Sequence, residues 1–295
     1  MKTSRAVSAP LSELAPAKVN LTLRVLGKRA DGYHDIESLV AFARFGDRLT
    51  FRPGARLDLR VSGPTAGEAG KPADNLVLRA ARALSERVDG LKLGRFALTK
   101  RLPAGAGLGG GSADAAAALR LLARANDISL DDPRLHEAAR MTGADVAVCL
   151  DPRPRLMRGI GDILSKPLAL PKFAVAVVHP RVPLATKDVF AALPPLPAGE
   201  RPASEASRAT LVGPLLEYLA RQANDLEQTA IRLEPVIAEV LAALRSLPGC
   251  RLARMSGSGS ACFALFESSR AAMTAARSLS RARADWWIRA SVLGG

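Results

Sequence analysis

LPAGAGLGGGSAD, residues 102–114, places five glycines within seven consecutive positions, between an expected strand and an expected helix. Small side chains let a backbone approach a ligand closely and allow positive φ angles. The alanine-rich helix expected over 115–125 follows directly, so unpaired N–H groups and the positive end of its dipole would face whatever the loop encloses. The stretch therefore predicts a phosphate-binding loop, and a flexible linker is the less favoured alternative.

Two familiar phosphate-binding motifs do not fit this stretch. A P-loop ends in Gly-Lys-Ser/Thr, whereas here Gly111 is followed directly by Ser112. The dinucleotide-binding fingerprint needs an acidic residue after a strand about 20 residues further on, and Asp131 and Asp132 are expected to open a helix instead. Three roles are open for the Ser112 hydroxyl: a hydrogen-bond donor to a phosphate, a ligand of Mg²⁺ or the N-cap of the helix. The sequence indicates no other metal ligand.

Upstream of the loop, apolar and polar residues alternate over 18–25, which predicts a strand with one polar face. Lys18 and Asn20 share that face. A cation and an amide that project together can contact an anion or orient a carboxylate, and an exposed strand face is the alternative.

Downstream of the loop, Asp145 stands directly before the apolar run VAVCL. An N-cap or turn-forming role is one interpretation. The other is a general base, because phosphoryl transfer to an alcohol needs a group that positions the hydroxyl and accepts its proton. A neighbouring cation such as Lys18 would keep the carboxylate ionised, although the sequence does not show that the two residues meet.

The composition limits the class of protein. The chain has 295 residues, enough for about two domains, and its 48% hydrophobic and 24% charged residues exclude a disordered, collagen-like or fibrous chain. No charge-free apolar run approaches the roughly 18 residues of a membrane span, and residues 1–10 lack the apolar core of a secretory signal. Three widely spaced cysteines fit neither a disulfide framework nor a zinc site, so we expect a cytoplasmic protein.

The net charge of +14 has two interpretations, nucleic acid binding or binding of a small anionic substrate. An RNA-binding module would cluster its basic residues with exposed aromatics. Here the arginines are dispersed and aromatics make up 4% of the chain. We therefore expect a small-molecule substrate, with no nucleic acid or membrane partner, in a monomer or homodimer. An RNA-binding module is the alternative from another class of protein.

Segments in a fixed order carry a resemblance to a known family. PAKVNL at 16–21, PAGAGLGGGS at 103–112 and MSGSGSA at 255–261 occur in the order that resembles the GHMP small-molecule kinases, which include galactose, homoserine and mevalonate kinases. RADGYH at 29–34 narrows the resemblance to the branch that acts on a cytidine diphosphate derivative of methylerythritol in the non-mevalonate isoprenoid pathway. The matching segments span about residues 14 to 266.

The resemblance implies an α+β fold of two GHMP kinase domains with the active site between them. Residues 1–168 would form a ribosomal-protein-like N-terminal domain that carries the ATP-binding loop and the catalytic pair. Residues 169–295 would form an α/β C-terminal domain. The proline-rich stretch 193–207 matches no family pattern and is expected to be an exposed connection.

The resemblance also implies an ATP-dependent kinase that uses Mg²⁺ and phosphorylates the tertiary hydroxyl at position 2 of the methylerythritol unit. Lys18 and Asp145 match the catalytic pair, with Asp145 as general base and Lys18 orienting it and stabilising its charge. The last glycine loop, 257–260, would line the site or form a tight turn. The residues that match ATP-binding positions are Pro103, Gly105, Ala106, Gly107, Leu108, Gly109, Gly110, Gly111, Ser112, Asn75 and Lys100. The residues that match substrate-binding positions are Asn20, Tyr33, His34, Thr186 and Phe190.

Three of these residues would recognise the cytosine base. Tyr33 and Phe190 offer rings for stacking, and His34 offers a donor and an acceptor for the base edge. The alternative, purely structural roles of these residues are a turn tyrosine, a core phenylalanine and a surface histidine. Among the residues that match ATP-binding positions, Asn75 could equally be the N-cap of a helix. A mevalonate- or homoserine-type kinase is the alternative within the family, but such a substrate has no base to stack on.

Overall fold

The computed structural model describes residues 9–195 and 212–294, which form two compact units. Unit 1 consists of residues 1–15, 46–101 and 111–150, and unit 2 consists of residues 16–45, 102–110 and 151–295. Each unit thus combines stretches that are far apart in the sequence. The expected domain boundary between residues 168 and 169 stays a prediction.

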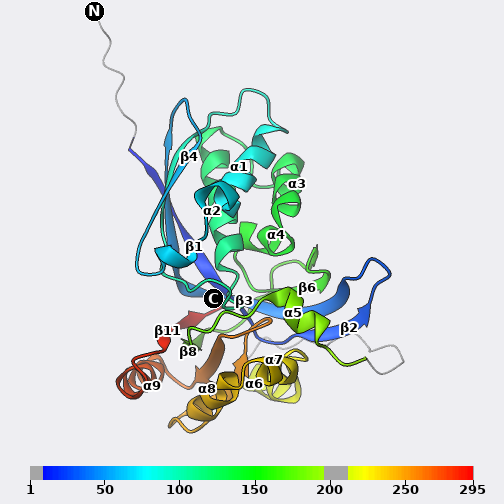
Figure 1. The fold of residues 1–295 in the computed structure, drawn as a ribbon, viewed down its shortest axis with the longest axis vertical. Helices are drawn as coiled ribbons and strands as arrows, with labels where there is room; N and C mark the ends of the chain where they lie inside the picture. Colours follow the sequence, from blue (N-terminus) through cyan, green and yellow to red (C-terminus); the bar gives the residue numbers. More distant parts are fainter. Residues whose placement is uncertain (1–8, 196–211, 295) are drawn as a thin grey trace, which may run out of the picture. The chain divides into compact units, whose positions relative to one another are not determined.

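Unit 1 combines a small sheet with four helices (Figure 1). The last part of β3 (His34–Pro53) pairs antiparallel with β5 (Gly94–Thr99), and β5 pairs in parallel with β4 (Asp58–Ser62). Figure 1 shows the helices gathered on one side of these strands. The helices are α1 (Leu76–Ser85), α2 (Gly110–Ala125), α3 (Pro133–Thr142) and α4 (Ala144–Leu150), with the 3-10 turns η1 (Ala66–Glu68) and η2 (Pro72–Asp74).

Helix α2 is the central element of unit 1, because residues 113–123 are all buried. Alanine has the highest helix propensity and lets neighbouring elements approach closely. The helix begins at Gly110, five residues before the predicted start, so the last two loop glycines lie in its first turn. Helix α1 begins directly after Asn75, and the Asn75 side chain caps it by accepting a hydrogen bond from Val77 N at 3.0 Å.

The sheet of unit 2 is antiparallel, with the order β3–β11–β8–β10–β9. These strands are β8 (Phe173–His179), β9 (Cys250–Met255), β10 (Cys262–Phe266) and β11 (Trp287–Leu293). All residues of β8 are buried. A central strand covered on both faces has a continuous apolar sequence instead of an alternating one, and the sequence FAVAVVH of β8 is nearly continuous in this way.

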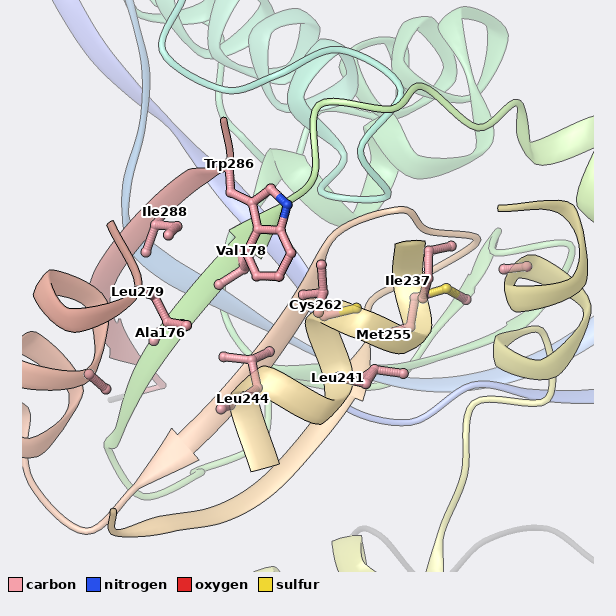
Figure 2. Packing of buried hydrophobic residues seen from close by; sticks show 14 of the residues in the cluster. Ala176, Val178, Ile237, Leu241, Leu244, Met255, Cys262, Leu279, Trp286 and Ile288 are labelled. Carbon is pink, nitrogen blue, oxygen red and sulfur yellow. The ribbon is translucent and has the colours of Figure 1, made fainter. Parts of the chain in front are cut away.

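Each face of this sheet has its own hydrophobic core. Val175 and Val177 of β8 pack in one core together with Leu102 and Leu108 of the glycine-rich stretch. Their neighbours along the strand, such as Val178, pack in the other core against α8 (Val236–Arg245) and α9 (Ser269–Ala282). Figure 2 shows this second core, where side chains of α8 and α9 gather against β8, β9, β10 and β11.

The remaining elements correct one expectation. The single strand predicted over 18–25 is wrong, because β1 ends at Asn20 and β2 begins at Arg24. Two helices lie between residues 226 and 247, and Pro235 directly precedes the second. Most of the proline-rich stretch 193–207 lies outside the described residues. These elements are β1 (Leu11–Asn20), β2 (Arg24–Lys28), β6 (Arg155–Gly159), β7 (Ile163–Leu164), α5 (Thr186–Ala191), α6 (Val212–Arg221) and α7 (Glu227–Leu233).

Within residues 9–195 and 212–294, no helix combines the length and the apolar character that crossing a membrane requires.

Candidate active site

The three motif segments meet within unit 2, although they lie far apart in the sequence. Lys18 N donates a hydrogen bond to Leu108 O at 2.9 Å, which joins the lysine strand to the glycine-rich loop. Ser256, just before the last glycine loop, accepts from Asn20 N at 3.1 Å and donates to Gly107 O at 3.0 Å. The Ser256 hydroxyl therefore links all three segments, a role that the sequence interpretation missed.

Two glycines of the middle loop allow this close approach. Gly107 has a φ of +71°, and a Cβ there would lie 2.4 Å from Ser256 O and 2.9 Å from Gly259 O. Gly109 has a φ of +63°, and a Cβ there would lie 3.2 Å from Lys18 Cβ and 3.3 Å from Lys18 Cε. The loop is packed and hydrogen-bonded on defined partners, so the flexible-linker alternative is wrong.

Helix α2 continues the loop into unit 1. The N–H groups of its first turn have no acceptor within the helix and lie at the positive end of the dipole. Ser112, half-buried, lies in that first turn, while Gly110 and Gly111 add no side chains. This is the arrangement in which a helix binds phosphate.

The polar face of the lysine strand is buried. Lys18 is 4% exposed and Asn20 is 3% exposed, so the alternative of an exposed strand face is wrong. Asn20 Nδ2 donates to Ser38 Oγ at 2.7 Å, and Asn20 Oδ1 has no hydrogen-bond partner among the described residues. A buried oxygen without a partner is costly, and a ligand hydroxyl would satisfy it.

Asp145 lies in unit 1 as the second residue of α4 and is half-buried. A carboxylate in the first turn of a helix is stabilised by the free N–H groups there. Because Asp145 lies within α4, it is not the N-cap residue, and the N-cap interpretation is wrong. The general-base interpretation stays a prediction.

Arg120 of α2 holds the other end of α4, and the sequence interpretation missed it. This side chain is buried, and its guanidinium donates to Cys149 O at 2.7 Å and to Leu14 O at 3.0 Å. The last carbonyls of a helix have no partner within the helix, and a cation is favoured there. Arg120 thereby fixes the helix that carries Asp145. The sequence signal that could have indicated it is a charged arginine inside a run of alanines and leucines.

The predicted cytosine-binding residues occur together in unit 2. His34 at the start of β3 stacks on Phe190 of α5, with ring centroids 5.0 Å apart and planes at 29°. Tyr33 beside them is 61% exposed. Burial, and to a smaller extent Lys28, lowers the pKa of His34. The imidazole is therefore neutral at pH 7 and offers one donor and one acceptor.

Thr186, the first residue of α5, lies against the last glycine loop. Its hydroxyl oxygen is 2.8 Å from Ser258 Oγ. The loop 257–260 is thus more than a tight turn between strands, because its Ser258 contacts α5. The adjoining Ser256 contacts the lysine strand and the middle loop.

Asn75 and Lys100 have internal partners in unit 1. Asn75 caps α1, as its alternative interpretation predicted. Lys100 is 5% exposed, and its ammonium group donates to the carboxylates of Asp47 and Asp114. Their places in an adenine pocket stay predictions.

The described residues contain no group of three or more His, Cys, Asp or Glu side chains that could hold a metal ion. The predicted role of Ser112 as a Mg²⁺ ligand stays a prediction.

Replacing Ser256 with alanine is expected to lower the free energy of unfolding by about 1–3 kcal/mol, because it leaves the buried Asn20 N–H and Gly107 C=O unpaired. Urea unfolding measures the change. Ser246→Ala is the matched control, since that hydroxyl bonds one backbone carbonyl at an exposed position. Equal losses in the two variants would show that Ser256 does not hold the segments together.

Comparisons with known proteins agree along nearly the whole chain. Residues 75–151 match the GHMP kinases N terminal domain and residues 201–285 match the GHMP kinases C terminal domain. A protein of Rhodopseudomonas palustris (strain HaA2), 4-diphosphocytidyl-2-C-methyl-D-erythritol kinase, is 55% identical over 296 residues, which cover 96% of this chain and 98% of that protein.

Solved structures extend this agreement. The crystal structure of a 4-(cytidine 5'-diphospho)-2C-methyl-D-erythritol kinase is 39% identical, with a TM-score of 0.78, and the match covers 97% of this chain and 100% of that one. A homoserine kinase from Cytophaga hutchinsonii is 21% identical, with a TM-score of 0.72 over 98% of this chain and 95% of that one. At that identity the likeness shows a shared fold alone.

Proposed function

The chain belongs to the 4-diphosphocytidyl-2-C-methyl-D-erythritol kinases of the GHMP kinase family, and we propose that it transfers the γ-phosphoryl group of ATP to the 2-hydroxyl of 4-diphosphocytidyl-2-C-methyl-D-erythritol. The products are the 2-phosphate and ADP. The family makes the chain an ATP-using small-molecule kinase of isoprenoid biosynthesis. The observation that carries the proposal is the 55% identity over 96% of the chain.

The geometry of the glycine-rich stretch supports ATP binding there. Backbone N–H groups of the loop and of the first turn of α2 would hold the phosphates. Mg²⁺ generally binds phosphate oxygens, waters and few protein ligands, which fits a site where the Ser112 hydroxyl is the candidate donor. When bound, the ion would screen the charge of the transferred phosphoryl group.

Two side chains would serve the transfer itself. Asp145 would position the attacking hydroxyl and accept its proton, and Lys18 would keep Asp145 ionised and oriented. The burial of Lys18 in a strand that is bonded to the glycine-rich loop supports a role beside the phosphates.

The second substrate would lie along unit 2. Tyr33 and Phe190 would stack on the cytosine ring, and the neutral His34 would bond its edge. Asn20 and Thr186 would contact the methylerythritol end. The unpartnered Oδ1 of Asn20 supports this assignment, because a substrate hydroxyl would satisfy it. A cytoplasmic location and a monomeric or homodimeric state stay predictions.

An acceptor series tests the proposal. ADP release with Mg²⁺-ATP is expected with the cytidylyl substrate and to be at least about 100-fold slower with bare methylerythritol, mevalonate or homoserine, because those acceptors cannot use the base-binding residues. A coupled assay of ADP release measures kcat/KM for each acceptor. Faster turnover with mevalonate or homoserine would support the other kinase types, and no turnover with any acceptor would favour the RNA-binding alternative.

A further inference from the structure

Asp47, Lys100 and Asp114 form a buried charged cluster in unit 1, in which Asp47 and Asp114 have no part in the proposed reaction and Lys100 has a predicted place in the adenine pocket. Lys100 Nζ donates to Asp114 Oδ2 at 2.8 Å and to Asp47 Oδ2. Asp47 Oδ1 accepts a hydrogen bond from Arg101 N at 2.5 Å. Lys100 is 5% exposed, Asp114 is 2% exposed and Asp47 is fully buried.

The cluster joins the two flanks of the glycine-rich loop. Lys100 and Arg101 are the last residues before the loop, at the end of β5. Asp114 lies in α2, directly after the loop and two residues beyond Ser112. Asp47 belongs to β3 and binds the first flank through both of its oxygens. The side chains thus tie the entry of the loop to its exit.

The charges in the cluster balance only when one carboxyl is neutral. Burial raises the pKa of Asp114 to about 8; Lys100 opposes that rise and Asp47 adds to it. Burial would lower the pKa of Lys100, but Asp114 and Asp47 raise it. Burial therefore favours the neutral form of Asp114, and Lys100 stays charged beside the two carboxyl groups. An uncompensated buried charge would be strongly destabilising.

We propose that Asp114 and Lys100 are positioning residues for phosphoryl transfer, which hold the flanks of the glycine-rich loop so that its N–H groups keep the geometry that binds ATP phosphates. The inference rests on the proposed role of this loop. Neither residue has to contact the nucleotide for this role, because the effect passes through the backbone of residues 102–113. Small displacements of a binding group can lower a rate by about 100-fold.

Binding of Mg²⁺ with adenosine 5′-(β,γ-imido)triphosphate, measured by calorimetry, tests the proposal without any acceptor substrate. Asp114→Ala is expected to raise the Kd of this nucleotide by about 10- to 100-fold, with the KM of the cytidylyl substrate unchanged within about two-fold. Asp114→Asn keeps the shape of the side chain and an oxygen that can accept the hydrogen bond from Lys100, so it is expected to keep nearly wild-type affinity. Asp114 is outside the predicted adenine contacts, so a lost base contact would not explain the change.

Asp132→Ala is the matched control, because it removes the half-buried N-cap carboxylate of α3 in the same unit. Loss of such a cap lowers stability by about 1 kcal/mol without touching the loop. Wild-type nucleotide affinity in a folded Asp114→Ala protein, or equal losses in the Asp132→Ala control, would overturn the proposal. Absence of turnover in the wild type with intact nucleotide binding would instead refute the proposed acceptor.

A variant at the other flank decides the matter if Asp114→Ala does not fold. Asp47 accepts hydrogen bonds from Lys100 Nζ and from Arg101 N, and it is outside the predicted nucleotide contacts. Asp47→Asn keeps the volume of the side chain but replaces one acceptor oxygen with a donor, so one of these two hydrogen bonds is lost. It is expected to raise the Kd of the same nucleotide by at least about fivefold. Wild-type affinity in a folded Asp47→Asn protein would overturn the proposal.

Discussion

Asp145→Asn is expected to lower kcat by about 10²- to 10⁴-fold, the usual contribution of a positioned general base. The amide has nearly the shape of the carboxylate but cannot accept the proton of the attacking hydroxyl. Asp145 lies inside α4 and is not its N-cap, so the amide removes only a charge–dipole contribution of about 0.3–1 kcal/mol and α4 should keep its first turn. Steady-state assays of ADP release with Mg²⁺-ATP and the cytidylyl substrate measure the change.

Asp132→Asn is the control for this variant, since Asp132 caps α3 and asparagine caps equally well. Its kcat should equal that of the wild type. A kcat of Asp145→Asn within about tenfold of the wild type, together with a raised KM, would place Asp145 in an orienting role and remove it as the base. Nucleotide binding measured separately shows that the variant retains its fold.

Gly107→Ala is expected to destabilise the protein by roughly 2–6 kcal/mol and to lower kcat/KM by more than about 100-fold. Its φ of +71° disfavours any residue with a Cβ. The new Cβ would lie 2.4 Å from Ser256 O and 2.9 Å from Gly259 O. Both are backbone atoms that cannot rotate away, so the two glycine loops would have to separate. Thermal unfolding and the ADP assay measure the two effects.

Gly90→Ala separates the two causes. Gly90 has a φ of +70°, nearly that of Gly107, but a Cβ there would have no neighbour within 4 Å. This control should therefore show the backbone strain alone, about 1–3 kcal/mol, with unchanged kcat/KM. If both variants lost stability and activity equally, the close approach of the loops would have no part in the site.

Much of the local structure followed from the sequence, because it depends on neighbouring residues. The apolar run 173–179 is β8, and the glycine-rich stretch precedes a buried alanine helix. Asn75 caps α1 as its side chain predicts. The order of the motif segments identified the family, and relatives 55% identical confirm it. Each of these inferences depends on residues that are close together in the sequence or on the order of the motif segments along the chain.

The contacts that build the site were decided by the tertiary structure. Ser256 binds Asn20 across 236 positions of sequence, and Lys100 binds Asp47 across 53. An alternating strand pattern predicts one exposed face, yet Lys18 and Asn20 are buried because other segments cover that face. Which polar groups meet in a folded interior depends on how distant segments pack. Periodicity records the side chains along one element, and it carries no information about the partner that covers them.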